Sequence, residues 1–306
     1  MYSAFVQDRL TLVPNKLWVT IGSKFEHNLY TGWENQPSGR LLWTPTPHQS
    51  VWAAITRAVR SPSRLDEDLS LTSLVSASSL PIFIRVAGDP TFKSETLLAY
   101  EAGYRQLVTQ KFYVDFAVFH NDYNNLTSFG SATFSVESTP PPTRLVITVP
   151  WANGIRGKTD GVEITPDWKV SPWLELKASY SYLNLDLENK PGNTDSSTLQ
   201  SDEGSSPRHE GTLQAHFNLP KRFEFDPTYR YVSALPAQFP SGFPADYVTA
   251  RSNMDARVSW HFSRDFELSM VGQNLFEPHH PEFSGDPGVL VGIRRSYFAK
   301  ITWKSE

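Results

Sequence analysis

The sequence predicts an all-β protein, an antiparallel up-and-down transmembrane β-barrel whose strands are joined alternately by short turns and long loops. Near the C-terminus, residues 253–262 alternate without a break between polar and apolar side chains, and the alternation resumes at Phe266, Leu268 and Met270. Connections of two or three residues alternate with Pro-, Ser- and Gly-rich stretches of up to about thirty residues. Lipid on one side of a wall and a wet lumen on the other produce this pattern.

Composition agrees with a membrane wall built from strands rather than helices. No run of about 18 apolar residues is present, so a helical membrane span is excluded. The hydrophobic share is 39% and the mean hydropathy is -0.38, because alternation dilutes each apolar residue with a polar one. Aromatic residues reach 13%, which is expected where rings anchor strands at two bilayer interfaces.

Charge and residue usage exclude several classes of function. A net charge of -4, with no basic run interleaved with aromatics, argues against nucleic acid as a partner. The chain has no cysteine, no Gly-x-Ser-x-Gly elbow, no phosphate-binding glycine loop and no His-Glu-x-x-His, so we predict neither enzyme activity nor a cofactor. Residues 1–8 lack the basic and apolar regions of a secretory signal, and we expect the N-terminal part of a longer protein to be missing.

Turn signals divide the chain into about thirteen strands, each near the ~10 residues that a tilted strand needs to cross a bilayer. The short connections, expected on the periplasmic side, lie at 14–15, 45–47, 108–110, 171–172, 220–222 and 263–264. The long connections, expected outside the cell, lie near 28–35, 61–93, 127–152, 188–206, 236–248 and 277–291. No helix of useful length is predicted.

Tryptophan placement supports this topology, because an interfacial belt should gather at one end of the strands. Six of the nine tryptophans fall near short turns or at the C-terminal end: Trp18, Trp43, Trp168, Trp173, Trp260 and Trp303. The alternative is a soluble β-sandwich with tryptophans near its strand ends. Its loops would not normally alternate so regularly between two and about thirty residues.

Two segments alternate less cleanly. After Tyr182 the apolar residues of 173–187 switch to the other face at Leu183, Leu185 and Leu187. We expect either a bulge near Tyr182 or emergence of the strand above the membrane. Residues 50–58 give no clean face and are assigned as a strand from their neighbours.

Six segments, in the same order as in the family, carry a resemblance. They read WAAITRAVRSPS at 52–63, YEAGYR at 100–105, FAVFHNDYNNL at 116–126, GKTDGVE at 157–163, ASYSY at 178–182 and VGQNLF at 271–276. Together they resemble the C-terminal half of a TonB-dependent outer-membrane receptor. The resemblance implies ligand-gated uptake of a ferric siderophore or similar scarce nutrient at the outer membrane of a Gram-negative bacterium.

The resemblance also implies what the whole receptor contains. Such receptors resemble a 22-stranded barrel with a plugged lumen. Residues 1–306 are therefore expected to be the C-terminal portion of the barrel, a partial wall without a plug domain or signal peptide. The implied partners are the TonB complex through the missing N-terminal region, a small-molecule siderophore, outer-membrane lipid and the barrel-assembly machinery. Residues 304–306 follow Trp303, whereas family members commonly end on an aromatic residue, so we expect weaker recognition by that machinery.

Most motif residues are expected to shape the barrel wall rather than to touch a ligand. A glutamate and an arginine of 100–105 are expected to face the lumen as a paired wall charge, and the glycine between them to permit close strand approach. The last motif is expected to end the penultimate strand. The residues concerned are Glu101, Gly103, Tyr104, Arg105, Asn274, Leu275 and Phe276.

Ligand contact is predicted at loop-proximal residues that suit an anionic or metal-bearing ligand: Arg60, Arg64, Tyr123, His279 and His280. No metal site is predicted. His279 and His280 lie near Glu282 and Asp286, but adjacent histidines in a strand point to opposite faces, and a solvated pair is the simpler interpretation. Residues 66–68 are interpreted as a solvated acidic loop.

Two other functions stay open. A passive porin-like channel would need no plug, but it would have to close with the strands present and carry a charged constriction. A soluble β-rich protein would bind carbohydrate through exposed aromatics. Such a protein should stay in solution without detergent, whereas a membrane wall should aggregate through its outward Phe112, Val114, Phe116 and Val118 face.

Overall fold

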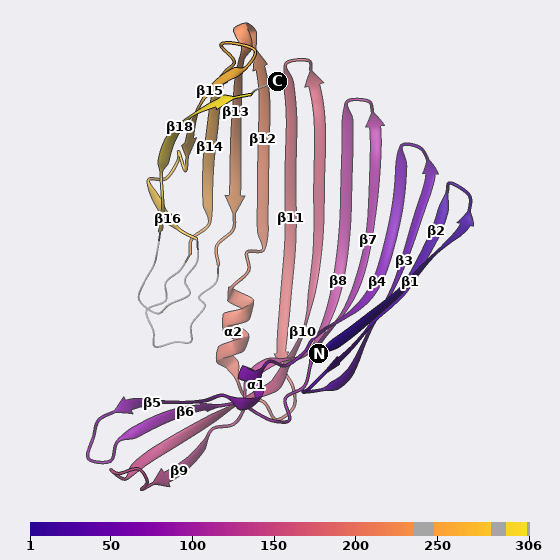
Figure 1. The fold of residues 1–306 in the computed structure, drawn as a ribbon. Coiled ribbons are helices and arrows are strands. Elements are labelled where there is room, and N and C mark those ends of the chain that lie inside the picture. Colours follow the sequence, from indigo (N-terminus) through magenta and orange to yellow (C-terminus); the bar gives the residue numbers. More distant parts are fainter. Residues whose placement is uncertain (236–247, 283–291, 305–306) are drawn as a thin grey trace.

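The computed structural model describes residues 1–235, 248–282 and 292–304, which form a large curved antiparallel sheet (Figure 1). Thirteen strands follow one another in chain order along this wall, and the predicted fold class is confirmed. Their bounds are β1 (Tyr2–Val13), β2 (Leu17–Asn28), β3 (Gly32–Thr46), β4 (Gln49–Arg60), β7 (Glu95–Thr109), β8 (Phe112–Phe129), β10 (Arg144–Ser171), β11 (Leu174–Asn189), β12 (His209–Leu219), β13 (Phe223–Val232), β14 (Arg251–Trp260), β15 (Phe266–Gln273) and β18 (Ser296–Trp303). The sheet does not close, because β1 and β18 each pair on one side within the described residues.

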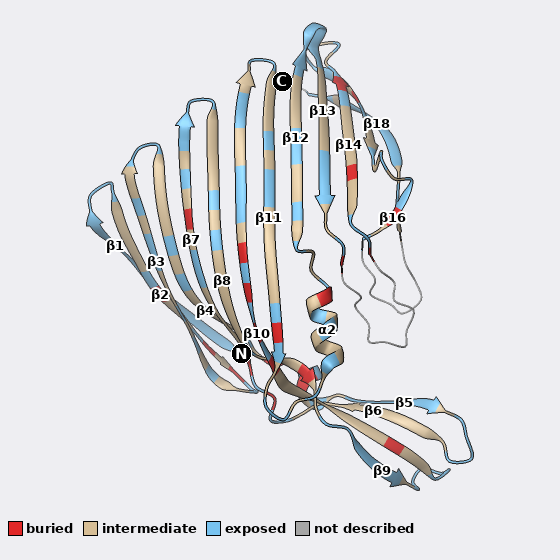
Figure 2. Cartoon of the chain, turned by 180° about the vertical axis from the view of Figure 1, so that it is seen from behind, coloured by how far each residue is buried: buried red, intermediate tan, exposed pale blue. Residues whose placement is uncertain are grey.

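Burial in the wall is inverted relative to a soluble protein. On β14, Ser259 is 1% exposed, whereas its neighbour Val258 is 46% exposed on the opposite face. Met270 and Ile301 continue the apolar face at 64% and 69% exposure. Figure 2 shows how few wall positions are buried. We call the polar face lumenal, because membrane barrels turn polar residues to the lumen and apolar residues to lipid.

An aromatic belt follows the short-turn end of the wall. Ring centroids lie 5.5 Å apart in the pair Phe223–Trp260 and 6.3 Å apart in Phe266–Trp303. The expected gathering of tryptophans holds on the apolar face. Trp18 is different, because it lies on the lumenal face beneath the Arg9 guanidinium, 5.0 Å from the ring centroid.

A second belt of tyrosine and histidine lies farther toward the long-loop end of the same face. Tyr100 packs on His120 with ring centroids 6.1 Å apart, and the Tyr180 hydroxyl lies 2.9 Å from Nδ1 of His209. Rings with a polar edge suit the interface where lipid meets water. The two belts together bound an apolar band of the kind that membrane barrels present to hydrocarbon.

The long connections are more structured than the sequence predicted. Residues 28–35 are not a long loop, since only 29–31 separate β2 from β3 and the Asn28 side chain accepts hydrogen bonds from the N–H groups of Tyr30 and Thr31. Within 61–93 and 127–152 lie α1 (Arg64–Asp68), β5 (Ser70–Ser76), β6 (Ile82–Ala87) and β9 (Thr133–Glu137).

Strands β5, β6 and β9 join the first part of β10 in a small sheet of order β5-β6-β10-β9, set at an angle to the wall (Figure 1). Its β6–β10 pairing is parallel, which the prediction of irregular loops missed. On one face Glu137 bridges Arg85 at 2.8 Å and Arg144 at 3.1 Å. These guanidiniums hold the pKa of the Glu137 carboxyl below its usual range.

The predicted bulge near Tyr182 is wrong. The β10–β11 register runs without a shift through Val162 and Tyr182, so Leu183, Leu185 and Leu187 occupy the lumenal face of an uninterrupted strand. A helix that the sequence analysis did not predict, α2 (Ser196–Gly204), packs beside β11, and Leu187 is 7% exposed. The leucines therefore change face to pack against a helix.

The remaining short elements are η1 (Pro220–Arg222), β16 (His279–Pro281) and β17 (Gly292–Arg294). Most of the predicted loops 236–248 and 277–291, including Asp286, lies outside the described residues. Residues 50–58 lie within β4, as expected. In the described parts of the chain, no helix has the length and apolar character needed to cross a membrane.

Cross-strand glycine–aromatic pairs are a feature that a substitution can test. Gly103 lies directly opposite Trp52, and a Cβ added at Gly103 would overlap the indole. We expect Gly103→Ala to destabilise the chain in detergent by about 1–3 kcal/mol, because an overpacked site forces side chains or backbone to shift. The measurement is the urea midpoint followed by tryptophan fluorescence.

Gly211→Ala is the matched control, because its added Cβ would meet only the Ser179 carbonyl oxygen at 3.8 Å, an ordinary contact. Equal shifts of the midpoint for the two variants would show that the Trp52 contact does not restrict residue 103.

Candidate functional site

The charged residues of the YEAGYR motif lie on the lumenal face of β7. Arg105 pairs with Asp115 of β8 at 2.7 Å, not with Glu101 as the sequence suggested. Glu101, and Glu163 of β10, have no cation within 4.0 Å among the described residues. Both carboxylates are exposed, so this part of the wall carries two negative charges with no positive partner in the described structure.

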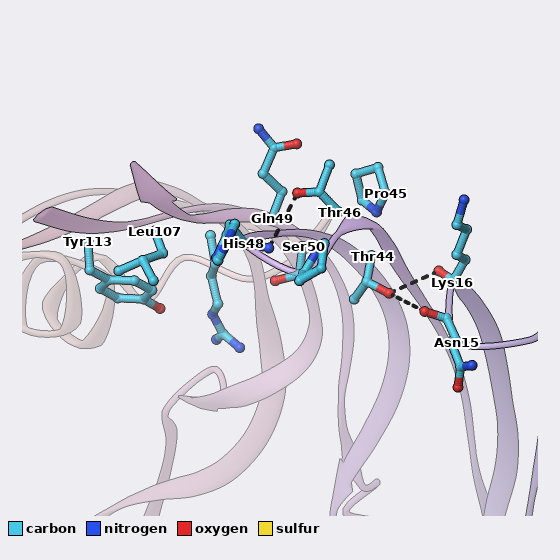
Figure 3. A pocket seen from close by; sticks show the side chains of 12 residues that line it. Asn15, Lys16, Thr44, Pro45, Thr46, His48, Gln49, Ser50, Leu107 and Tyr113 are labelled. Atoms are coloured by element: carbon cyan, nitrogen blue, oxygen red, sulfur yellow. Dashed lines mark hydrogen bonds between the residues drawn. The ribbon is translucent and has the colours of Figure 1, made fainter. Parts of the chain in front are cut away.

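Three cavities adjoin one another over the lumenal face of β1 to β8. The cavity in Figure 3, about 680 Å³, is bounded by the two turns at 15–16 and 44–48 and by Leu107 and Tyr113. It shares Arg105 with a cavity of about 400 Å³. That cavity in turn shares Trp52 and Glu101 with a third cavity of about 500 Å³. The wall is thus hollowed continuously from the short-turn rim inward.

At the long-loop end, Arg60 is fixed by a bidentate ion pair. Its Nε and Nη2 lie 2.7 and 2.8 Å from the carboxylate oxygens of Glu95, and Nη2 also donates to Thr127 at 2.8 Å. The β4–β7 register aligns Arg60 with Glu95, so the strand pairing itself brings the two together. Arg60 remains exposed and retains some capacity to meet a ligand.

Asparagine side chains tie the neighbouring loops together. Asn153 accepts from the Lys93 N–H at 2.6 Å and donates to the carbonyl oxygens of Lys93 and Asn125. Asn125 accepts from the Lys190 ammonium at 2.6 Å. Burial lowers the pKa of the Lys190 ammonium, and the positive charges of Lys93 and Arg156 lower it further. The contacts join β8 and β10 to the connections that hold Lys93 and Lys190, and together these parts form one platform.

Asp195 clamps α2 to the end of β8. One carboxylate oxygen accepts from the N–H groups of Ser197 and Thr198 and so caps the helix, and the other accepts from the Phe129 N–H at 2.6 Å. Burial alone would raise the pKa of Asp195, but these hydrogen bonds outweigh it and hold the pKa below its usual range.

The predicted ligand residues do not form one cluster. Arg64 lies on α1, is 86% exposed and pairs with Asp68 at 3.4 Å. Tyr123 lies on β8 opposite Leu97. His279 and His280 lie on β16, where His280 is 4% exposed and its Nε2 lies 3.2 Å from Glu282. The wall strands between β4 and β15 separate Arg60 from the two histidines.

The other motif residues lie at structural positions. Asn274 has a left-handed φ of 55° and follows β15, and its side-chain oxygen accepts from Asn253 at 2.6 Å. Leu275 donates its N–H to the Met254 carbonyl at 2.8 Å, and Tyr104 hydrogen-bonds Gln106 along its own strand. Within the described residues, no three His, Asp or Glu side chains are arranged to hold a metal ion.

A sheet with a lipid-type face, two aromatic belts and a hollowed polar face is the wall of a membrane β-barrel. The family described as TonB dependent receptor-like, beta-barrel matches residues 1–275. The chain therefore belongs to this family, whose members are transport receptors rather than enzymes. No curated protein matches the sequence at a significant level.

Solved siderophore receptors share the fold. The receptor PirA from Acinetobacter baumannii has a TM-score of 0.75 at 15% identity, covering 98% of this chain and 45% of PirA. A mutant of the ferric enterobactin receptor PfeA from Pseudomonas aeruginosa has a TM-score of 0.77 at 18% identity, covering 98% and 44%. The ferric-catecholate import receptor Fiu from K12 E. coli has a TM-score of 0.72 at 12% identity, covering 98% and 44%. The chain thus spans less than half of each relative.

Sequence reasoning missed Asp195, Asn153 and Glu163. Asp195 followed by two serines and a threonine is an N-cap signal, and it could have indicated α2 inside the expected loop. Its bond to Phe129 joins residues 66 positions apart, so no local pattern indicates it. The unpaired state of Glu163 likewise depends on the register of β8, β10 and β11.

The Asp195 clamp gives a testable prediction. Asp195→Ala removes the helix cap, worth about 0.5–2 kcal/mol, and leaves the Phe129 N–H without its acceptor. We expect faster amide hydrogen exchange across 188–206 in detergent. Because the folded-state pKa is lowered, the clamp is fully formed above the ordinary aspartate pKa and is lost as the pH falls through the lower folded-state value.

Asp202→Ala on the same helix is the control, because its side chain makes no hydrogen bond within the described structure. If both variants exchange at the same increased rate, loss of helical charge rather than loss of the clamp is responsible.

Proposed function

We propose that this chain forms part of the wall of an outer-membrane receptor that takes up a ferric siderophore in a Gram-negative bacterium. The observation that carries the proposal is the wall itself, in which one face presents exposed apolar side chains and the other presents polar ones. In a soluble protein, residues such as Tyr297, 70% exposed, and Met270, 64% exposed, would form an unfavourable apolar surface. The relatives PirA, PfeA and Fiu are named for siderophores, ferric enterobactin and ferric catecholates.

Closure requires strands from outside these thirteen. In hydrocarbon, every unpaired backbone group of β1 and β18 costs several kcal/mol, so an open wall is not stable in a bilayer. Outer-membrane transporters with a plugged lumen have 22 strands. We propose that residues 1–306 are the C-terminal part of such a barrel and that the remaining strands and a plug come from the rest of the receptor.

Glu101 and Glu163 are suited to hold the plug. They lie on the lumenal face around one cavity and have no cation within 4.0 Å among the described residues. Arginine or lysine side chains of a lumenal domain would complete these pairs with charge-assisted hydrogen bonds. Gating by the TonB complex would then require breaking these pairs.

Ligand capture is proposed at the opposite, long-loop end. Arg60 lies at this end of β4 beside Glu95 and Thr127, Arg64 lies on α1, and Tyr123 lies on the lumenal face of β8. His279 and His280 belong to another part of the rim. An anionic ferric complex is attracted by guanidinium groups and by aromatic rings that stack on planar ligands.

Transport is the first prediction. Cells that depend on this receptor for ferric catecholate should lose radio-iron uptake when the gene of the TonB protein is deleted, while surface binding of the complex persists. The receptor should fractionate with the outer membrane. Uptake that is unchanged without TonB would contradict the proposal and favour a passive channel.

The plug contact is tested by Glu101→Gln combined with Glu163→Gln in the intact receptor. Loss of both charges weakens plug docking, so we expect increased sensitivity of the cells to a large antibiotic that normally cannot cross the outer membrane. Glu188→Gln is the control, because Glu188 already pairs with Arg156 at 2.7 Å. Unchanged sensitivity in the double variant would exclude these carboxylates as plug contacts.

A further inference from the structure

Two rows of side chains cross the lumenal face of β1 to β4 in register. Arg9 lies opposite Thr20, Thr20 lies opposite Arg40, and Arg40 lies opposite Ala54. In the adjoining row, Trp18 lies opposite Leu42 and Leu42 opposite Trp52. Directly paired residues share a face, and rows two residues apart lie about 7 Å from each other. The pairing thus sets two guanidiniums beside two indoles.

These side chains line the cavity of about 500 Å³, together with Gln7 and Glu101. A volume in the range of about 300–1,000 Å³ is typical of small-molecule sites. The strand spacing of about 4.8 Å places the backbones of Arg9 and Arg40 roughly 10 Å apart. Leu42 lies between the two indoles across the strands, and the Arg9 guanidinium lies 5.0 Å from the Trp18 ring centroid. A planar anion over Leu42 would meet this guanidinium–indole pair on one side and Trp52 on the other.

The cavity holds polar groups that have no partner in the described structure. Arg40, on the inner strand β3, is exposed and has no carboxylate within 4.0 Å in the described structure, whereas Arg9 lies on β1, at the end of the sheet. The Trp52 indole N–H is buried and has no acceptor among the described residues. Structural arginines in this wall are instead paired, as Arg105 is with Asp115 and Arg257 is with Asp226.

This cavity and its neighbour differ in the sign of their net charge. Arg9 and Arg40 outweigh the single carboxylate of Glu101 at its edge, whereas the adjoining cavity holds Glu101, Asp115 and Glu163 against Arg105 alone. The acidic cavity suits cations of a plug. The basic, aromatic cavity suits a planar anion, because guanidinium and indole faces bind such groups by charge, hydrogen bonds and stacking.

We infer that the cavity of Arg9, Trp18, Arg40 and Trp52, here called the exit subsite, binds an aromatic anion such as a ferric catecholate during its passage through the lumen. This inference rests on the proposed function. Trp18 and Trp52 each lie within three residues of the start of a strand that follows a short turn. The shared cavities continue from the exit subsite to the short-turn rim, where a transported molecule would leave.

The first test separates capture from passage in cells that depend on the receptor for iron(III) tris(2,3-dihydroxybenzoate). We expect Arg9→Gln combined with Arg40→Gln to lower the uptake rate about tenfold or more, as loss of hydrogen bonds to a charged group implies, while surface affinity stays unchanged. Arg222→Gln combined with Arg264→Gln, at two exposed positions near short turns, is the matched control for total charge, read by its uptake rate.

Three outcomes are distinguishable. Normal uptake in the Arg9 and Arg40 variant overturns the exit subsite and leaves the proposed function intact. Reduced uptake together with entry of a large antibiotic also overturns it, because these residues then hold the plug rather than the substrate. Failure of the unaltered receptor to bind or take up the complex refutes the proposed function itself.

A second measurement does not depend on transport. The 306-residue chain in detergent micelles is titrated with the same iron complex, and quenching of tryptophan fluorescence is recorded. The inference predicts saturable quenching in the unaltered chain. The quenching should be lost in the double variant Arg9→Gln/Arg40→Gln and reduced in the double variant Trp18→Phe/Trp52→Phe. Trp33→Phe, on an exposed indole at the start of β3, is the control. Quenching that persists in the arginine variant overturns the exit subsite.

Discussion

Backbone hydrogen bonding between neighbouring strands is the constraint on which the rest of this structure depends. Hydrocarbon offers no partner for a free N–H or C=O, so each strand of the wall must be paired along its whole membrane-crossing length. The thirteen wall strands meet this requirement everywhere except at β1 and β18, the two ends of the sheet. Pairing also fixes register, and register decides which side chains meet across the lumenal face. The cavities are consequences of that pairing.

The wall does not rely on an apolar core for its order. Its buried apolar residues are few, and several of them, such as Phe92, Val146 and Leu187, lie at the long-loop end. There the chain behaves like a soluble protein, with a capped helix, a small sheet and loops tied by asparagine side chains. Between the belts it follows membrane rules, with lipid as the apolar partner. The proposed function uses both regions, since a ligand must be captured in water and then pass through the lumen that the wall encloses.

The sequence predicted the wall because alternation is a local signal that each strand carries by itself. It predicted neither the small sheet nor α2, since the parallel pairing of β6 with β10 and the Asp195 clamp join segments far apart in the chain. The sequence also did not predict Asp115 as the partner of Arg105, for a different reason. A plain hairpin over the turn at 110–111 would align Arg105 with Phe116, but a register shift between Leu107 and Thr109 aligns it with Asp115. One irregularity near a turn thus changes every pair beyond it.

The register of the strands also decides which charges on the lumenal face are left unpaired. Where the wall pairs its own charges, as Arg257 does with Glu224 and Glu267, neighbouring strands are held together and no charge is left for a partner. Over β1 to β10 the wall leaves Arg9, Arg40, Glu101 and Glu163 without such partners in the described structure. These four side chains are exposed and available to a partner, and their concentration on one part of the wall agrees with the plug and anion contacts proposed above. A movable plug and a passing anion would need opposite charges there, and the two cavities carry opposite charge.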